Sequence, residues 1–226
     1  MQIFHFVILF SLAYTQYHSF EWGSITSLLT PTGIQVIDDG RVYASTGGGL
    51  LEFNPQTDEL NFIKMEEGLI YLDLSTITMD SQGRLWLGGA YPKGYLQVYE
   101  PDQGLVREIT HLKDVSEIRM IEIGSQKAYA VYVGTASDAT GILEFDLDDS
   151  GLPDYRDYYT NFSTTTVTEI RDFDYYQDSL LYITTDQGIF VGRQGDNLKF
   201  IESWHPVYEE NNGIQFIPQS PSLVVL

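Results

Sequence analysis

The sequence predicts an all-β fold, a β-propeller of four-stranded antiparallel blades. Three observations predict it. Short apolar runs, each bounded by turn-forming residues, recur along the chain in groups of three. An aromatic residue returns at a set place in the second run of each group, and a glycine opens the third run. A repeat of ~40–50 residues made of short strands is typical of one propeller blade.

The aromatic residue of the second run defines the period. An interval of 43 residues separates Tyr43 from Trp86 and Trp86 from Tyr129, and 53 residues separate Tyr129 from Tyr182. The glycines that open the third runs are Gly49, Gly94, Gly141 and Gly188. A fourth run follows each group: LNFIKM from Leu60, LVREI from Leu105, YRDYYT from Tyr155 and LKFIES from Leu198.

The second runs are apolar at consecutive positions. They read RVYAS, RLWLG, KAYAVYVG and LLYITT. A strand with one face in water would alternate between apolar and polar residues, so this pattern indicates strands that are covered on both faces. Propeller blades meet this condition because each lies between two others. The alternative is a β-sandwich whose self-similarity is accidental.

In chain order, residues 1–16 are predicted to be a signal peptide. The run IFHFVILFSLAY is too short to span a bilayer but fits the apolar region of such a peptide; the alternative is a buried first strand. Residues 17–226 are assigned to the propeller. Residues 20–29 are expected to close the ring by pairing with its last blade, with Trp22 as a packing residue.

Four blades are predicted at about residues 34–65, 75–110, 118–160 and 169–203, with turns such as Asp39-Gly40 between strands. Inserts lengthen one loop of the second blade, at 90–93, and one of the third, at 135–140. Residues 214–226 are assigned to a partial fifth blade. About four and a half blades do not complete a ring, so we expect an N-terminal fragment of a longer polypeptide. The alternative is a five-bladed ring completed by the N-terminal segment.

The charge is strongly acidic. The chain has 12 Lys and Arg against 32 Asp and Glu, a net charge of −20, so nucleic acid is excluded as an expected partner. The lack of cysteine excludes disulfides, thiolate catalysis and Cys-ligated zinc. After the signal peptide no apolar run reaches transmembrane length, so the mature segment is not expected to insert into a membrane.

One stretch, DLDDSGLPDYRD from Asp146, has the ligand spacing of a calcium loop. Its oxygen donors are Asp146, Asp148, Ser150, Asp154 and Asp157. They occupy the first, third, fifth, ninth and twelfth positions of the stretch, with a glycine at the sixth to turn the chain. The alternative, which we favour because such turns are common between strands, is an acidic hairpin turn in the third blade. Apart from this Ca²⁺ candidate, no cofactor is expected.

No catalytic arrangement is evident. The four histidines lack metal-binding or triad spacing, and the glycine cluster at 47–49 is not followed by a helix or a Lys-Ser pair. We therefore expect a non-enzymatic binding module. The alternative is a propeller enzyme, a lyase or a glycan-active protein. That alternative requires the inner-strand positions near Gln35, Thr78, Arg119 and Arg171 to form a polar cluster with carboxylates at the axis.

The repeats resemble the bacterial two-component-regulator propeller repeat, on the segments ITMDSQGRLWLGG, VYASTGGGLLEFNPQT and LLYITTDQGIFVG. The start EWGSITSL is similar to the N-terminal propeller of PorZ-type proteins of the type IX secretion apparatus. The resemblance implies an exported protein of a Gram-negative bacterium, in the periplasm, on the outer membrane or at the cell surface. It also implies a role as a periplasmic sensor or a secretion-associated surface protein. The expected partner is a protein or a glycan.

Overall fold

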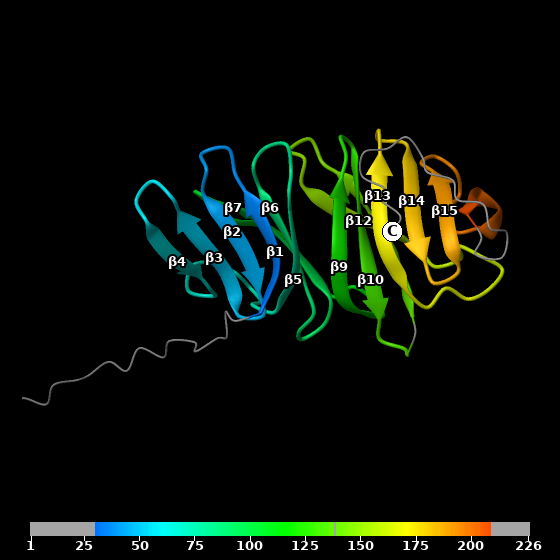
Figure 1. Ribbon diagram of the computed structural model, residues 1–226, viewed down its shortest axis with the longest axis horizontal. Coiled ribbons are helices and arrows are strands. Elements are labelled where there is room, and N and C mark those ends of the chain that lie inside the picture. The colour runs from blue at the N-terminus through cyan, green and yellow to red at the C-terminus, as the bar shows by residue number, and fades with distance from the viewer. Residues whose placement is uncertain (1–29, 138, 209–226) are drawn as a thin grey trace, which may run out of the picture.

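The computed structural model describes residues 30–137 and 139–208, which form four antiparallel four-stranded sheets (Figure 1). The strands of the first two sheets are β1 (Pro31–Val36), β2 (Val42–Thr46), β3 (Gly49–Asn54), β4 (Glu59–Ile63), β5 (Leu74–Met79), β6 (Leu85–Gly89), β7 (Tyr95–Glu100) and β8 (Gly104–Ile109). Those of the third and fourth are β9 (Val115–Ile123), β10 (Lys127–Gly134), β11 (Thr140–Leu147), β12 (Pro153–Tyr159), β13 (Ile170–Tyr176), β14 (Leu180–Thr185), β15 (Gly188–Arg193) and β16 (Trp204–Tyr208). Within the described residues, a 3₁₀ turn, η1 (Ile201–Ser203), lies between β15 and β16.

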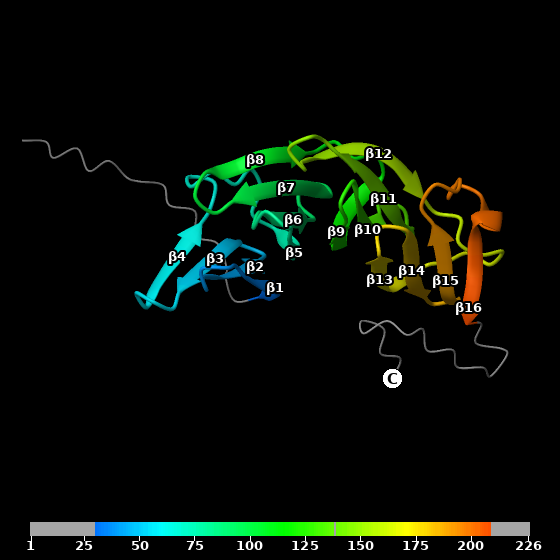
Figure 2. The same cartoon turned by 90° about the horizontal axis from the view of Figure 1, so that it is seen from above.

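The sheets are the blades of a β-propeller, which confirms the predicted fold class. In each sheet the strands follow chain order, so each blade is a simple meander. Figure 2 shows the four blades along an arc, with β1, β5, β9 and β13 on its inner side and β4, β8, β12 and β16 on its outer side. The inner strands of successive blades contact one another, β5 with β1 and β9, and β9 with β13.

The core consists of three apolar layers, one between each pair of neighbouring blades. Tyr43 and Leu87 belong to the layer between the first and second blades, and Trp86 and Phe145 to the next. The third layer, between the third and fourth blades, contains Tyr129. Tyr43, Trp86 and Tyr129 therefore each face the blade that follows their own, and this packing need accounts for the interval of 43 residues between them.

The apolar second strands are explained by the same packing. On β6, Leu85 and Leu87 enter the layer toward the first blade, whereas Trp86 between them enters the layer toward the third. On β10, Ala130 and Tyr129 point to opposite layers in the same way. Because successive side chains of a strand point to opposite faces, both phases must be apolar when both faces are covered.

The predicted position of the fourth strand of the fourth blade is wrong. The run LKFIES from Leu198 is not a strand: the chain turns there, continues through η1 and forms β16 only from Trp204. Leu198 and Trp204 are both buried in the same layer, and the indole Nε1 of Trp204 donates to the carbonyl of Leu198 over 3.0 Å. The two apolar anchors lie six residues apart, and a turn between them brings both into the core.

Several predicted segments lie outside the described residues. These are the signal peptide at 1–16, the ring-closing segment at 20–29 with Trp22, and the partial fifth blade at 214–226. Within the described ranges, no helix has the length and hydrophobicity needed to cross a lipid bilayer.

The first blade exposes the sheet face that is turned away from the second blade. Two cross-strand rows occupy this face, and both are wholly apolar. One row is Ile34, Ala44, Leu51 and Phe62, and the other is Val36, Val42, Phe53 and Leu60. The exposed fractions of Ile34 and Leu60 are 65% and 51%. We call these eight residues the apolar flank.

A buried arginine joins the second blade to the third. Arg84 is 6% exposed, and its Nε lies 2.7 Å from a carboxylate oxygen of Asp80. The two terminal nitrogens of the guanidinium donate to the carbonyls of Ser150 and Gly151, each over 2.8 Å. Asp80 also accepts from the indole nitrogen of Trp86 over 3.1 Å. The group is therefore fully paired although it is removed from water, as a buried charge requires.

We expect Arg84→Met to lower the free energy of unfolding by about 2–4 kcal/mol, because the buried Asp80 carboxylate loses its cation and two carbonyls lose a donor. Urea unfolding measures the loss. The control is Arg156→Met, since Arg156 is exposed and its pair with Asp146 is 3.8 Å long. The control should change stability by less than about 0.5 kcal/mol. Equal losses in the two variants would contradict this role of Arg84.

Candidate functional site

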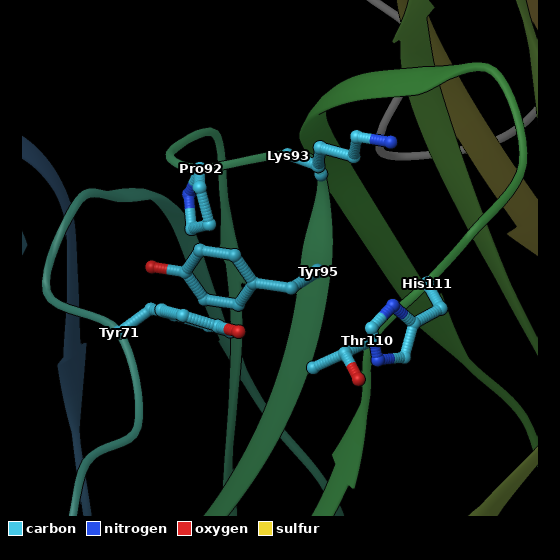
Figure 3. Close-up of a pocket in the computed structure, with 7 residues that line it drawn as sticks. Tyr71, Pro92, Lys93, Tyr95, Thr110 and His111 are labelled. Carbon is cyan, nitrogen blue, oxygen red and sulfur yellow. The ribbon is translucent and has the colours of Figure 1, made fainter.

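A pocket opens where three connections of the first half of the arc meet. Its volume is about 320 Å³. The β4–β5 connection supplies Tyr71, the β6–β7 loop supplies Pro92, Lys93 and Gly94, and the β8–β9 connection supplies His111. Tyr95 and Thr110, at the neighbouring strand ends, complete the lining (Figure 3). Loops held by a rigid scaffold are where binding residues commonly lie. The β6–β7 loop contains the insert that the sequence analysis placed at 90–93.

A buried glutamine fixes one wall of this pocket. Gln97 on β7 is 0% exposed. Its side-chain oxygen accepts from the amide of Ile70 over 2.7 Å, and its side-chain nitrogen donates to the carbonyl of Tyr71 over 3.0 Å. These bonds satisfy backbone groups of the β4–β5 connection that no strand partner reaches. The connection is therefore held against the second blade, and Tyr71 is positioned before any ligand arrives.

Two tyrosine rings belong to this wall of the pocket. The rings of Tyr71 and Tyr95 are tilted at 46° with centroids 4.8 Å apart. Tyr95 is only 1% exposed, and its hydroxyl donates to the carbonyl of Asp73 over 2.9 Å. Burial, with the nearby Asp73 charge, raises the pKa of Tyr95 far above its usual range, so this hydroxyl stays protonated. Tyr95 supports the site, and Tyr71 carries the more accessible ring.

The opposite side of the pocket is polar. In Figure 3, Pro92 lies with the two tyrosine rings, whereas the side chains of Lys93 and His111 extend on the other side of Tyr95. His111 has a φ of 61°, a backbone conformation that is uncommon outside glycine and that is enriched at functional sites. The arrangement combines an apolar wall with a cationic edge.

The candidate calcium residues do not converge on one point. The carboxylate of Asp148 turns back to the amides of Ser150 and Leu152, which lowers its pKa. Asp148 and Asp154 both pair with Arg107, at 2.6 and 2.8 Å. Asp146 pairs with Lys127, and Asp157 pairs with Lys199. Within residues 30–137 and 139–208, no group of three or more His, Asp or Glu side chains could hold a metal ion. Calcium binding stays a prediction, and the stretch forms the β11–β12 turn of the hairpin alternative.

The inner-strand positions of the enzyme alternative lie on β1, β5, β9 and β13. Arg119 pairs with Glu117 at 3.3 Å within β9, and Arg171 pairs at 3.1 Å with Glu169, the residue directly before β13. Gln35 and Thr78 are half-buried. These pairs involve exposed side chains, and they do not join one inner strand to another.

The sequence analysis did not predict a cluster of three acidic side chains on β9 and β13. Burial, together with the charges of Asp174 and Asp172, raises the pKa of Glu122 to about 7. These three carboxylates lie at the junction of the third and fourth blades. Sequence reasoning did not find this group because its members are separated by about 50 residues and meet only after the blades have packed.

Comparisons with known proteins give structural neighbours only. No protein-family model matches the chain, and no curated protein matches it significantly. It is similar to the extracellular domain of a hybrid two component system, BT3049 of B. thetaiotaomicron, with 17% identity, a TM-score of 0.50, and coverage of 75% of this chain and 22% of that one. It is also similar to the extracellular domain of a second such system, BT4673 of the same organism, with 15% identity and a TM-score of 0.53. This match covers 78% of this chain and 21% of that one. At this identity the likeness establishes the fold alone. The chain spans about a fifth of the length of these neighbours.

We expect Gln97→Leu to lower the free energy of unfolding by about 1–3 kcal/mol, because buried backbone groups lose their partners. Exchange of the Ile70 amide with solvent should accelerate, which NMR detects directly. Gln126→Leu makes the same substitution at an exposed turn of the third blade. That control should leave both quantities unchanged. Unaltered exchange at Ile70 in the Gln97 variant would show that the glutamine does not hold the connection.

The folded-state pKa of Glu122 lies above its usual value of 4.5, so the folded state holds this proton more tightly than the unfolded chain does. The carboxyl therefore stabilises the fold most below about pH 4.5, and its contribution falls as the pH rises through about 7. Glu122→Gln should raise the free energy of unfolding by about 1–2 kcal/mol at about pH 8, after allowance for partial exposure. The variant should also weaken the pH dependence.

Urea unfolding of the Glu122 variant at several pH values tests this. Glu108→Gln, which neutralises an exposed carboxylate on β8, corrects for the general effect of the net charge. If both variants change the pH profile equally, the specific role of Glu122 is refuted.

Proposed function

We propose that this chain is an exported, non-enzymatic binding module that takes a ligand into the pocket between Tyr71, Pro92 and His111. The observation that carries this proposal is the fixed lining. A fully buried glutamine and a hydrogen-bonded tyrosine hold the aromatic wall in place, and a lining set in advance reduces the ordering cost of binding. A concave site with an apolar wall and a few polar groups is the usual form of a ligand site.

A role as the extracellular part of a sensor has the most support. The two structural neighbours are described as extracellular domains of hybrid two component systems, and the repeats resemble the two-component-regulator propeller repeat. Because the chain spans only a fifth of those neighbours, signal transmission belongs to a longer polypeptide in this proposal. The resemblance to PorZ-type proteins supports the alternative, a surface protein associated with type IX secretion.

Export is the corresponding proposal for location. It is supported by the apolar run IFHFVILFSLAY at the N-terminus and by the extracellular neighbours. The non-enzymatic part of the proposal is supported by the arrangement on the inner strands. There Arg119 and Arg171 each pair with a glutamate two residues earlier in the chain, and among the described residues neither pairs with a residue of another inner strand.

A ligand-observed NMR screen with a library of small fragments tests the binding role. We expect wild-type protein to give hits that are lost in Thr110→Trp, because an indole at this position fills the pocket. Thr165→Trp, at an exposed position in the β12–β13 connection, should retain the hits. Thermal unfolding confirms that both variants fold. If the hits survive in Thr110→Trp, or if none occurs, the pocket is not the binding site.

A further inference from the structure

We propose that the pocket recognises a carboxylate anion carried on a ring, with Lys93 and His111 at the carboxylate and Tyr71 and Pro92 against the ring. This inference rests on the proposed function, since it names the ligand class of the same pocket.

The first step is the pairing of the cations. All 12 Lys and Arg residues lie within the described ranges. Nine of them have a carboxylate oxygen within 4.0 Å: Arg41, Arg84, Arg107, Lys113, Arg119, Lys127, Arg156, Arg171 and Lys199. Lys64 engages in another interaction. In the described part of the chain, neither Lys93 nor Arg193 forms an ion pair, although acidic residues are far more numerous than basic ones. One of these two unpaired cations lines the pocket.

The second step is the position of the nearby carboxylates. Glu117 is engaged by Arg119, and Asp114 lies 4.0 Å from Lys113. The carboxylate of Asp73 lies against Gly47 of the first blade, and Asp73 does not line the pocket. No Asp or Glu belongs to the lining, so the pocket presents positive charge without a competing carboxylate.

The third step is the pair of polar side chains beside Lys93. Thr110 and His111 line the pocket, and among the described residues neither side chain has a hydrogen-bond partner. A hydroxyl and an imidazole that face an open pocket can each donate to a carboxylate oxygen. Together with the Lys93 ammonium they supply three donor groups on one side of the pocket (Figure 3).

The fourth step is the apolar wall. Tyr71 and Pro92 present ring surfaces, and Tyr95 behind them has its hydroxyl bonded to Asp73. This wall offers contact area, and the Tyr95 hydroxyl is not free to donate to a ligand. A ring body, either flat or puckered, fits such a surface, whereas a small free anion would leave it unused. The net charge of −20 also disfavours small anions, which gain no contact area to offset the repulsion.

The probes are benzoate and cyclohexanecarboxylate, one with a flat ring and one with a puckered ring. Their uncharged counterparts are benzamide and cyclohexanecarboxamide. Titrations followed by protein NMR should give dissociation constants of about 1–10 mM for the acids, in keeping with ligands of this size, and about tenfold weaker binding of the amides. Binding should weaken as salt is added, because the cationic edge is exposed.

Three variants test the role of Lys93, and two of them, Lys93→Gln and Arg193→Gln, carry the same net charge. Lys93→Gln should weaken benzoate binding about three- to tenfold, and Lys93→Arg should restore it. Arg193→Gln removes the other unpaired cation, on β15, and should leave binding unchanged. Equal weakening in the Lys93→Gln and Arg193→Gln variants would reduce the effect to net charge and would overturn the proposal.

A further variant separates binding from folding. Residues with positive φ are strained unless they are glycine, so His111→Gly should retain or raise the melting temperature while it weakens benzoate binding. The outcomes also separate the two proposals. If amides and acids bind equally and Thr110→Trp blocks both, the pocket is a binding site but not one for anions. If no probe binds and fragments bind elsewhere, the proposed function fails as well.

Discussion

A blade of this protein cannot cover its own faces, and the rest of the structure depends on that constraint. Each sheet is apolar on both sides at its second strand, so it is stable only between two others. The three described layers meet this need by placing one large aromatic side chain, Tyr43, Trp86 or Tyr129, from each blade against the next. The period of the sequence is therefore a packing period, and radial order around an axis follows from it.

Polar groups are buried where segments must be joined in one particular way. Arg84 holds the β11–β12 turn of the following blade, and Gln97 holds the connection that carries Tyr71. Apolar layers tolerate small slides, because dispersion contacts are not directional. Hydrogen bonds to specific carbonyls and amides do not tolerate them. Buried hydrogen bonds of this kind thus set the position of one blade relative to the next, and they also shape the pocket.

The fold could be predicted from the sequence because the residues that pack the blades recur at regular intervals. The aromatic period and the turn residues identified all four meanders. It misplaced the last strand of the fourth blade because Leu198 looks like a strand residue, and only Trp204, six residues on, reveals the turn. The pocket was not predicted, since Tyr71, Lys93 and His111 come from three connections and have no mutual spacing. The spacing of Asp146 to Asp157 fits a calcium loop, but Arg107, Lys127 and Lys199 pair with its carboxylates. A local motif cannot predict these pairs, because the three cations lie outside the motif in the sequence.

The apolar flank of the first blade is made of apolar side chains, as are the faces that later blades bury against one another. Ile34, Val36, Leu60 and Phe62 offer a ready surface for any sheet that presents a protruding aromatic side chain, as Tyr43 does on the opposite face. Hydrocarbon left in water on this scale promotes association. This exposed surface therefore governs whether solutions of the protein stay monodisperse. Shielding that surface, by added blades or by polar replacements, is the practical route to well-behaved samples.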